Sequence, residues 1–226
     1  MGTEMKSNSP SGVTHGTVSR AKSTGRSRPS RGRQPGERHH HSRREELLSG
    51  LEEIFFREGY RRVTVGELAA RLHCSRRALY RLAASKEELF VLILDRMLCR
   101  IRQQSDEGIA RAGDSAERIT AMIRPGITEP MACTASFFAD IAGLPAAKQL
   151  LEQHQEASLQ QLRELIEEGV GSKECRDLHA EVAAQAMLAA YRAITDPRFL
   201  MTVDVSLGEA LQEAQDLFLH GLLHPA

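Results

Sequence analysis

The sequence predicts an all-α protein, and two observations carry this prediction. From Arg43 onward, apolar residues recur every three or four positions, which is the spacing of amphipathic helices. Proline and glycine interrupt this pattern at intervals that suit helix ends, and no stretch alternates between apolar and polar residues for the length of a strand. The chain has 226 residues, of which 41% are hydrophobic, so it can bury one sizeable core or two small domains that share one.

Four helices are expected first, at residues 43–58, 64–72, 75–83 and 86–104. Gly59 follows the first apolar stripe and is typical of a helix C-terminus. Thr64 and Glu67 have the three-residue spacing of a capping box, in which a hydroxyl and a carboxylate satisfy free N–H groups of the first turn. Ser85 and Glu88 repeat this spacing at the start of the fourth helix. Each of these helices therefore has a start or stop signal of its own.

Further helices are expected at residues 115–124, 131–142, 145–168, 177–195 and 207–223, for about nine in all. Pro125, Pro130, Gly143, residues 169–172 and the Asp196-Pro197 pair separate them. The periodic pattern thus continues to the end of the chain.

Charge is distributed unevenly along the chain, although the formal net charge is zero. Residues 1–41 carry eight Lys/Arg against two Asp/Glu, residues 42–104 thirteen against nine, and residues 105–226 nine against nineteen. This basic front and acidic back indicate a polyanionic partner, most simply nucleic acid. Residues 1–42 are too polar to bury a core, and we expect a disordered basic arm that either lies along DNA or remains a solvated tail.

The second and third expected helices have the dimensions of a helix-turn-helix, since only His73 and Cys74 separate them and Ser75 caps the third. Leu79 and Leu82 lie on one face of the third helix. The opposite face carries Arg76, Arg77, Tyr80 and Arg81. A solvated face usually mixes charges of both signs, whereas this face has no acid, so we expect it to contact DNA.

These motifs together resemble the DNA-binding domain of the TetR family of transcriptional regulators. The resemblance rests on residues 51–60, 64–70, 75–80 and 85–90, which supply a first helix ending in Gly-Tyr, a Thr-capped second helix, a Leu-Tyr pair in the recognition helix and a Ser-Lys-Glu start to the fourth. Members usually have an aromatic pair after the recognition-helix tyrosine, where this chain has Leu82, Ala83 and Ala84. The resemblance implies a helix-turn-helix domain at residues 43–104, including the fourth helix, and a helical domain for ligand binding and dimerisation at residues 105–226.

The resemblance also implies the residues that contact DNA. Thr64 and Gly66 would lie over the phosphate backbone, while Arg76 and Arg77 would read bases in the major groove with Ala78 against a thymine methyl. Tyr80 and Lys86 would bind phosphates, and Arg81 would bind either a phosphate or a base. The expected DNA-binding set is Thr64, Gly66, Ser75, Arg76, Arg77, Ala78, Tyr80, Arg81 and Lys86.

The last two long helices are the candidates for a homodimer interface. Residues 177–195 are rich in alanine, which allows another helix to approach closely, and residues 207–223 carry large apolar residues at helical spacing. Paired half-sites in a palindromic operator also require a two-fold symmetric protein. The alternative is that both helices serve only the internal core.

A pocket for a small effector is implied between the middle helices. Polar residues interrupt apolar faces there, and the paucity of aromatic residues favours a mainly aliphatic pocket over an aromatic cage for cations. The candidate ligand-binding residues are Thr134, Phe137, Phe138, His154, Gln161, Tyr191 and Arg192.

The sequence therefore predicts a transcriptional regulator that represses its targets and leaves double-stranded operator DNA when an effector binds. A DNA-bound structural or adaptor protein, whose acidic domain binds a protein partner, remains the alternative. We expect no enzyme and no cofactor, since the chain lacks nucleophile-elbow, phosphate-loop, dinucleotide-binding and zinc-protease motifs.

The remaining motifs point to a cytoplasmic protein without a metal site. The longest apolar run, residues 89–94, is too short to cross a membrane, and no signal peptide precedes it. The four cysteines form no C-x-x-C pair, and the adjacent His39, His40 and His41 lack a fixed geometry for a metal. We expect reduced, structural thiols, with an oxidant or electrophile sensor as the alternative.

Overall fold

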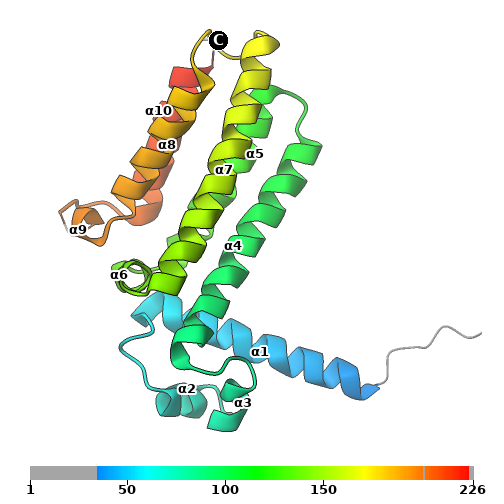
Figure 1. Cartoon of the computed structure of the whole chain (residues 1–226), viewed down its shortest axis with the longest axis vertical. Helices are drawn as coiled ribbons and strands as arrows, with labels where there is room; N and C mark the ends of the chain where they lie inside the picture. Colours follow the sequence, from blue (N-terminus) through cyan, green and yellow to red (C-terminus); the bar gives the residue numbers. More distant parts are fainter. Residues whose placement is uncertain (1–34, 201, 224–226) are drawn as a thin grey trace, which may run out of the picture.

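A computed structural model describes residues 35–200 and 202–223, and these residues form an all-α fold, as the sequence predicts (Figure 1). They contain ten α-helices, one 3-10 helix and no β-strand, since the pairing of Cys175 with Leu223 is an isolated bridge. The elements are α1 (Pro35–Glu58), α2 (Val65–Arg71), α3 (Arg76–Tyr80), α4 (Lys86–Arg111), α5 (Ser115–Thr128), η1 (Pro130–Ala132), α6 (Ala135–Gly143), α7 (Pro145–Gly171), α8 (Ala180–Ile194), α9 (Pro197–Leu200) and α10 (Leu207–Leu222).

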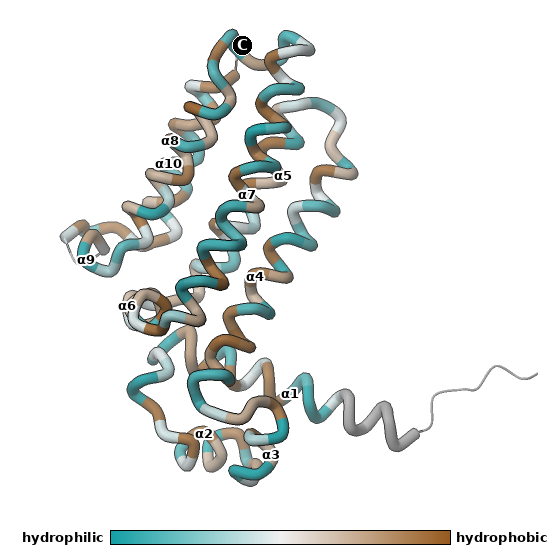
Figure 2. The backbone as a smooth tube through the Cα atoms, viewed as in Figure 1, coloured by the Kyte–Doolittle hydropathy of each residue, from teal (hydrophilic) through white to brown (hydrophobic). Residues whose placement is uncertain are grey.

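The helices divide into a small end and a long bundle (Figure 1). Helices α1, α2 and α3 gather around the start of α4, and α4 then runs into the bundle, where it packs on α5 and α7. Helices α8 and α10 pack on each other and close the far side, while α6 lies across the base of the bundle against α1 and α7. Hydrophilic and hydrophobic residues alternate along α4 and α7, as in helices with one buried face (Figure 2).

Helix α1 begins earlier than the sequence pattern predicts. It starts at Pro35, so residues 35–42, expected to belong to a disordered arm, are helical. A proline fits the first position of a helix because it has no N–H group to leave unpaired. At the C-terminal end of this added stretch, the Ser42 hydroxyl donates to the carboxylate of Glu46, one helical turn further on, over 3.3 Å. The rest of the expected arm, residues 1–34, lies outside the described residues, as do the side chains of His39–His41.

Other helix ends also differ from the expected ones. Helix α4 continues past Gln104 to Arg111 because Ser105, normally a poor helix former, is buried and donates to the Met122 carbonyl over 2.9 Å. Helix α5 runs through Pro125, whose ring is buried, so apolar burial offsets the backbone hydrogen bond that proline cannot make. The expected helix at 131–142 is split, and the short α9 lies in a segment expected as a connection.

Six of the ten aromatic residues gather where the small end meets the bundle. Phe90 of α4 stacks on Tyr60 with ring centroids 4.8 Å apart and meets Phe55 and Phe137 edge-on, while Phe56 also meets Phe137. Phe137 in turn contacts Phe138. This cluster supplies aromatic volume between α1, α4 and α6, whereas Leu82, Ala83 and Ala84, which follow α3, supply none.

All four cysteines are free thiols. Cys133 and Cys175 are buried, and burial raises the pKa of both thiols, which disfavours the reactive thiolate. Cys99 is exposed on α4. Among the described helices, none is both long and apolar enough to span a membrane.

Candidate nucleic-acid interface and effector cavity

The two helices of the helix-turn-helix begin at the caps that the sequence predicts. The Thr64 hydroxyl accepts from the Glu67 N–H over 3.2 Å, and the Glu67 carboxylate accepts from the Thr64 N–H over 2.7 Å. This backbone hydrogen bond is the main reason that the pKa of Glu67 is lowered. In α3, the Ser75 hydroxyl accepts from the Ala78 N–H over 3.1 Å. Reciprocal capping fixes the start of α2, and Ser75 fixes the start of α3.

The turn between α2 and α3 has a left-handed residue at its centre. His73 has a φ of +48°, and its N–H and that of Cys74 donate to the carbonyls of Ala70 and Ala69, at 3.2 and 2.9 Å. These two bonds form a Schellman motif, which usually contains glycine at the left-handed position. Arg43 of α1 donates to the His73 carbonyl over 3.1 Å, so α1 holds the turn in place.

Helix α3 has the two faces that the sequence predicts. Leu79 is fully buried, whereas Tyr80 is 50% exposed. The exposed face consists of Arg76, Arg77, Tyr80 and Arg81. Within residues 42–199 and 202–223, whose side chains are described, these three arginines form no ion pair. The face therefore presents three positive charges that are available to an external anion.

Two residues of the expected DNA-binding set have a structural role as well. A methyl group added to Gly66 would lie 2.8 Å from Nη2 of Arg76, so the missing side chain at Gly66 leaves room for that guanidinium. Lys86 is half-buried, donates to the Val63 carbonyl over 3.0 Å and lies 5.2 Å from the centre of the Tyr60 ring. Lys86 thus helps to hold the segment between α1 and α2 on α4.

Helix α6 and its N-cap residue, Thr134, form hydrogen bonds with the C-terminal end of α1. The buried Asp140 carboxylate accepts from the backbone N–H groups of Tyr60 and Arg61, at 2.6 and 3.3 Å. The Thr134 hydroxyl donates to the last carbonyls of α1, those of Phe56 at 3.1 Å and Arg57 at 3.1 Å. Donors and acceptors left free where α1 ends are therefore satisfied by α6 rather than by solvent.

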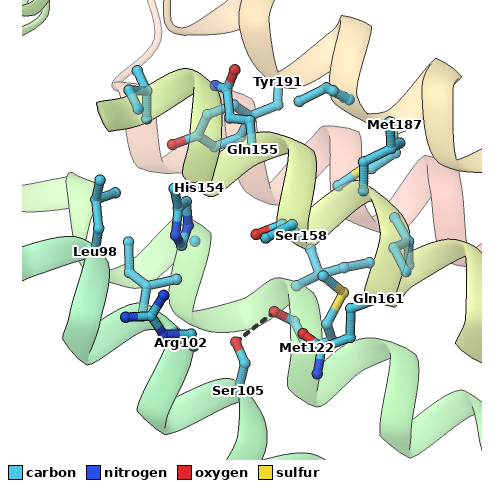
Figure 3. Close-up of a pocket in the computed structure, with 18 of the residues that line it drawn as sticks. Leu98, Arg102, Ser105, Met122, His154, Gln155, Ser158, Gln161, Met187 and Tyr191 are labelled. Atoms are coloured by element: carbon cyan, nitrogen blue, oxygen red, sulfur yellow. Dashed lines mark hydrogen bonds between the residues drawn. The ribbon is translucent and has the colours of Figure 1, made fainter. Parts of the chain in front are cut away.

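A cavity of about 160 Å³ lies in the bundle between α4, α5, α6, α7 and α8 (Figure 3). Its walls are mainly aliphatic, with methionines from α4, α5 and α8. The polar side chains that line it are Arg102, Ser105, His154, Gln155, Ser158, Gln161, Tyr191 and Thr195. A largely apolar cavity with a few polar groups is the usual form of a small-molecule site.

The structure brings four of the seven expected ligand-binding residues to this cavity: Phe138, His154, Gln161 and Tyr191. The other three lie elsewhere. Thr134 binds the end of α1, Phe137 is fully buried in the aromatic cluster, and Arg192 is exposed and donates to the Gln155 amide oxygen over 2.8 Å. Phe137 and Arg192 each precede or follow a lining residue, Phe138 or Tyr191, by one position, and periodicity does not say which neighbour such a position packs against.

Burial dominates the electrostatics of the cavity. It lowers the pKa of His154, and the positive charge of Arg102 lowers it further, so the imidazole is neutral near pH 7. Burial also raises the pKa of the Tyr191 hydroxyl, which keeps its proton. The site thus offers neutral hydrogen-bonding groups beside one guanidinium.

Sequence reasoning missed five of the polar residues that line the cavity: Arg102, Ser105, Gln155, Ser158 and Thr195. For Ser158 a signal was present, because His154, Ser158 and Gln161 follow one another at i, i+4 and i+7 on one face of α7. No signal in the sequence pointed to Arg102, because a charged residue near the end of the expected helix at 86–104 is most often solvated. Asp140 was also missed, although a carboxylate in an otherwise apolar helix is unusual.

Helices α8 and α10 each expose apolar residues, which are together called the apolar strip below. On α8, Val182, Ala186, Ala189 and Ala193 lie at i, i+4, i+7 and i+11 and are all exposed. On α10, Leu217 is 77% exposed, whereas Leu211 and Leu222 are buried in the core. The two helices therefore serve the internal core and still present apolar residues outward.

Comparisons with known proteins agree with this architecture. Residues 47–93 match the model for bacterial regulatory proteins of the tetR family. No curated protein sequence matches the chain significantly. Among solved structures, a TetR transcription regulator from Haloarcula marismortui has a TM-score of 0.67 at 17% identity, over 81% of this chain and 100% of that one.

Two further solved structures share the fold. A transcriptional regulator from Saccharomonospora viridis in complex with choline has a TM-score of 0.66 at 17% identity, over 82% of this chain and 100% of that one. A TetR/AcrR-family regulator from Thermobifida fusca has a TM-score of 0.61 at 20% identity, over 80% of this chain and 98% of that one. The chain thus combines a segment that matches the tetR family model, residues 47–93, with a fold that it shares with these solved regulators.

Proposed function

We propose that the protein is a homodimeric repressor that binds a palindromic operator through α3 and releases it when a small molecule occupies the bundle cavity. The observation that carries this proposal is the unpaired positive face of α3. Among the described residues this face has no internal partner for its three arginines, while α4 runs from beside it to the wall of the cavity.

The base-reading groups are Arg76 and Arg77 at the start of α3. A guanidinium can hold O6 and N7 of guanine with two hydrogen bonds, and each such contact discriminates by about 1–3 kcal/mol. Ala78 follows Arg77 in α3, and its methyl group would touch a thymine methyl in the same groove. Tyr80 and Arg81 lie one turn further along, where phosphates border the groove.

The positioning contacts come from helix starts. Thr64 and Gly66 at α2, Ser75 at α3 and Lys86 at α4 bring backbone N–H groups, hydroxyls and an ammonium to the same end of the molecule. Free N–H groups at helix N-termini bind phosphate oxygens well. Loss of these contacts is expected to weaken binding on all sequences alike, unlike loss of the base-reading arginines.

The apolar strip on α8 and α10 supports dimerisation. Its alanines allow a second copy of α8 to approach closely, and Leu217 would leave water on contact. A two-fold axis along this strip gives two α3 helices on one side, as an operator with two half-sites requires.

Helix α6 offers the path from the cavity to the DNA-binding end. Phe138 and Ile141 line the cavity, while Asp140 on the same helix holds the backbone of Tyr60 and Arg61 after α1. A ligand that displaces Phe138 or Ile141 therefore moves the support of α1, which in turn holds the helix-turn-helix through Arg43. The equilibrium shifts toward a dimer whose half-site spacing no longer matches DNA.

The test is selection of genome fragments by the purified chain, followed by sequencing, at two salt concentrations. Wild type is compared with the Arg76→Ala/Arg77→Ala variant and with Arg124→Ala/Arg198→Ala, which removes two exposed arginines far from α3. A few palindromic sites, lost only in the first variant, are the expected result. Broad recovery that survives this variant and disappears on deletion of residues 1–34 would instead support the adaptor function.

A further inference from the structure

The charged side chains that line the cavity are of one sign, positive. Arg102 is the only charged residue among those that line it, and none of them is acidic. One lining residue, Gln161, donates its amide to a carboxylate outside the lining, that of the exposed Asp106, over 3.1 Å. The cavity therefore offers a positive pole to a ligand and no negative one.

Arg102 is not committed elsewhere within the described part of the chain. It forms no ion pair there, and its guanidinium donates only to the Cys99 sulfur, over 3.4 Å. Its positive charge and that of a protonated His154 would repel each other, which contributes to the lowered pKa of the imidazole. An anion between them would interact favourably with both.

Most of the polar lining groups come from α4 and α7, which also supply apolar lining residues such as Leu98 and Leu162 (Figure 3). Arg102 and Ser105 of α4 face His154, Ser158 and Gln161 of α7. The surface from α5, α6 and α8 is largely aliphatic or aromatic, and its polar groups are those of Tyr191 and Thr195 at the end of α8. A ligand with one polar end and an apolar body matches this division.

Resting on the effector role proposed above, we propose that the cavity binds a small amphipathic carboxylate, with Arg102 as the ion-pair partner of its head group and the apolar walls around its chain. The inference separates this protein from the Saccharomonospora viridis relative, whose complex contains choline, because a quaternary ammonium here would face a guanidinium and no carboxylate. In size, the cavity of about 160 Å³ is similar to apolar cavities of about 150 Å³ that hold benzene, so an unbranched acid of about six to eight carbons is the probe of choice.

Calorimetric titration of the full chain with octanoate, octan-1-ol and choline tests the inference. Octanoate is expected to bind about tenfold more tightly than the alcohol, a modest gain because the Arg102 side chain is exposed to water as well as lining the cavity. Arg102→Gln is expected to remove this preference and leave the affinity for the alcohol unchanged. Arg124→Gln, which changes an exposed arginine outside the cavity, keeps it.

A second variant shows whether binding occurs in the cavity. Gly126 lines it, and a Cβ atom added there meets no atom within 4 Å, so we expect Gly126→Leu to be tolerated and its larger side chain to fill part of the cavity. This variant should lose both octanoate and octanol. Equal affinities for acid and alcohol, tighter binding of choline, or octanoate binding that Gly126→Leu leaves intact would each overturn the inference.

Operator binding separates this inference from the proposed function. If octanoate binds as expected and weakens the complex with a selected operator, both stand. If octanoate binds as expected and operator affinity does not change, the carboxylate site stands and release by this ligand fails. If choline or the alcohol binds better and releases the operator, the proposed function stands and the carboxylate inference fails.

Discussion

Removal of the Asp140 carboxylate should destabilise the junction between α1 and α6. Asp140 is only 5% exposed, and its Oδ2 accepts from two backbone N–H groups, at 2.6 Å from Tyr60 and 3.3 Å from Arg61. In Asp140→Ala the N–H of buried Tyr60 keeps no partner, which costs about 1–3 kcal/mol, and the charge-assisted character of the bond adds to this loss. We expect the free energy of unfolding to fall by about 2–4 kcal/mol, and by about 1–2 kcal/mol in Asp140→Asn, which retains a neutral acceptor.

Urea unfolding followed by far-ultraviolet circular dichroism measures these differences, at one protein concentration because the stability of the proposed dimer would depend on it. Asp216→Ala, an exposed carboxylate on α10, is the control and should change the free energy of unfolding by less than about 0.5 kcal/mol. If Asp140→Ala stays within the same limit, the two hydrogen bonds do not hold the junction, and the path from cavity to DNA through α6 loses its support.

Three further substitutions test other parts of the account. Gly66→Ala should preserve or raise the melting temperature but weaken operator binding in fluorescence anisotropy, because its methyl group displaces the Arg76 guanidinium; unchanged affinity would contradict this. Ala189→Glu should turn the dimer into a monomer in sedimentation velocity, since two carboxylates would meet at the strip, and an intact dimer would exclude α8 from the interface. The pKa of His154 is lowered in the fold, so the unfolded chain binds the proton first and the free energy of unfolding falls as pH decreases through about 6.5. His154→Gln should reduce this fall between pH 7 and 5.5, as measured by urea titrations at each pH. Identical pH profiles for wild type and variant would refute this prediction.

Much of the DNA-binding end was predictable from sequence because its signals are local. Thr64 and Ser75 cap their helices as expected, and Gly59 ends α1 with a φ of +78°. The division of α3 into a buried Leu79 face and an exposed arginine face also followed from three or four residues at helical spacing. Interactions within a few residues of one another leave a mark in the sequence that physical rules can read.

The cavity and the junction were less predictable because they depend on contacts between distant segments. Thr134 was expected in the pocket, yet it donates to carbonyls of α1 nearly eighty positions earlier. Arg102 was not singled out, since its place beside His154 follows from how α4 crosses α7. Periodicity identifies which residues of a helix are turned inward but not which helix they meet.

The most direct test of the central claim is the affinity of the protein for one selected operator, compared between wild type and Arg76→Ala/Arg77→Ala by fluorescence anisotropy. Two base-reading contacts of about 1–3 kcal/mol each predict a loss of specific affinity of at least about thirtyfold, with unchanged helical content and dimer mass. Arg124→Ala/Arg198→Ala should bind as wild type does. Equal affinities of wild type and the α3 variant for that operator would contradict the assignment of α3 as the recognition helix.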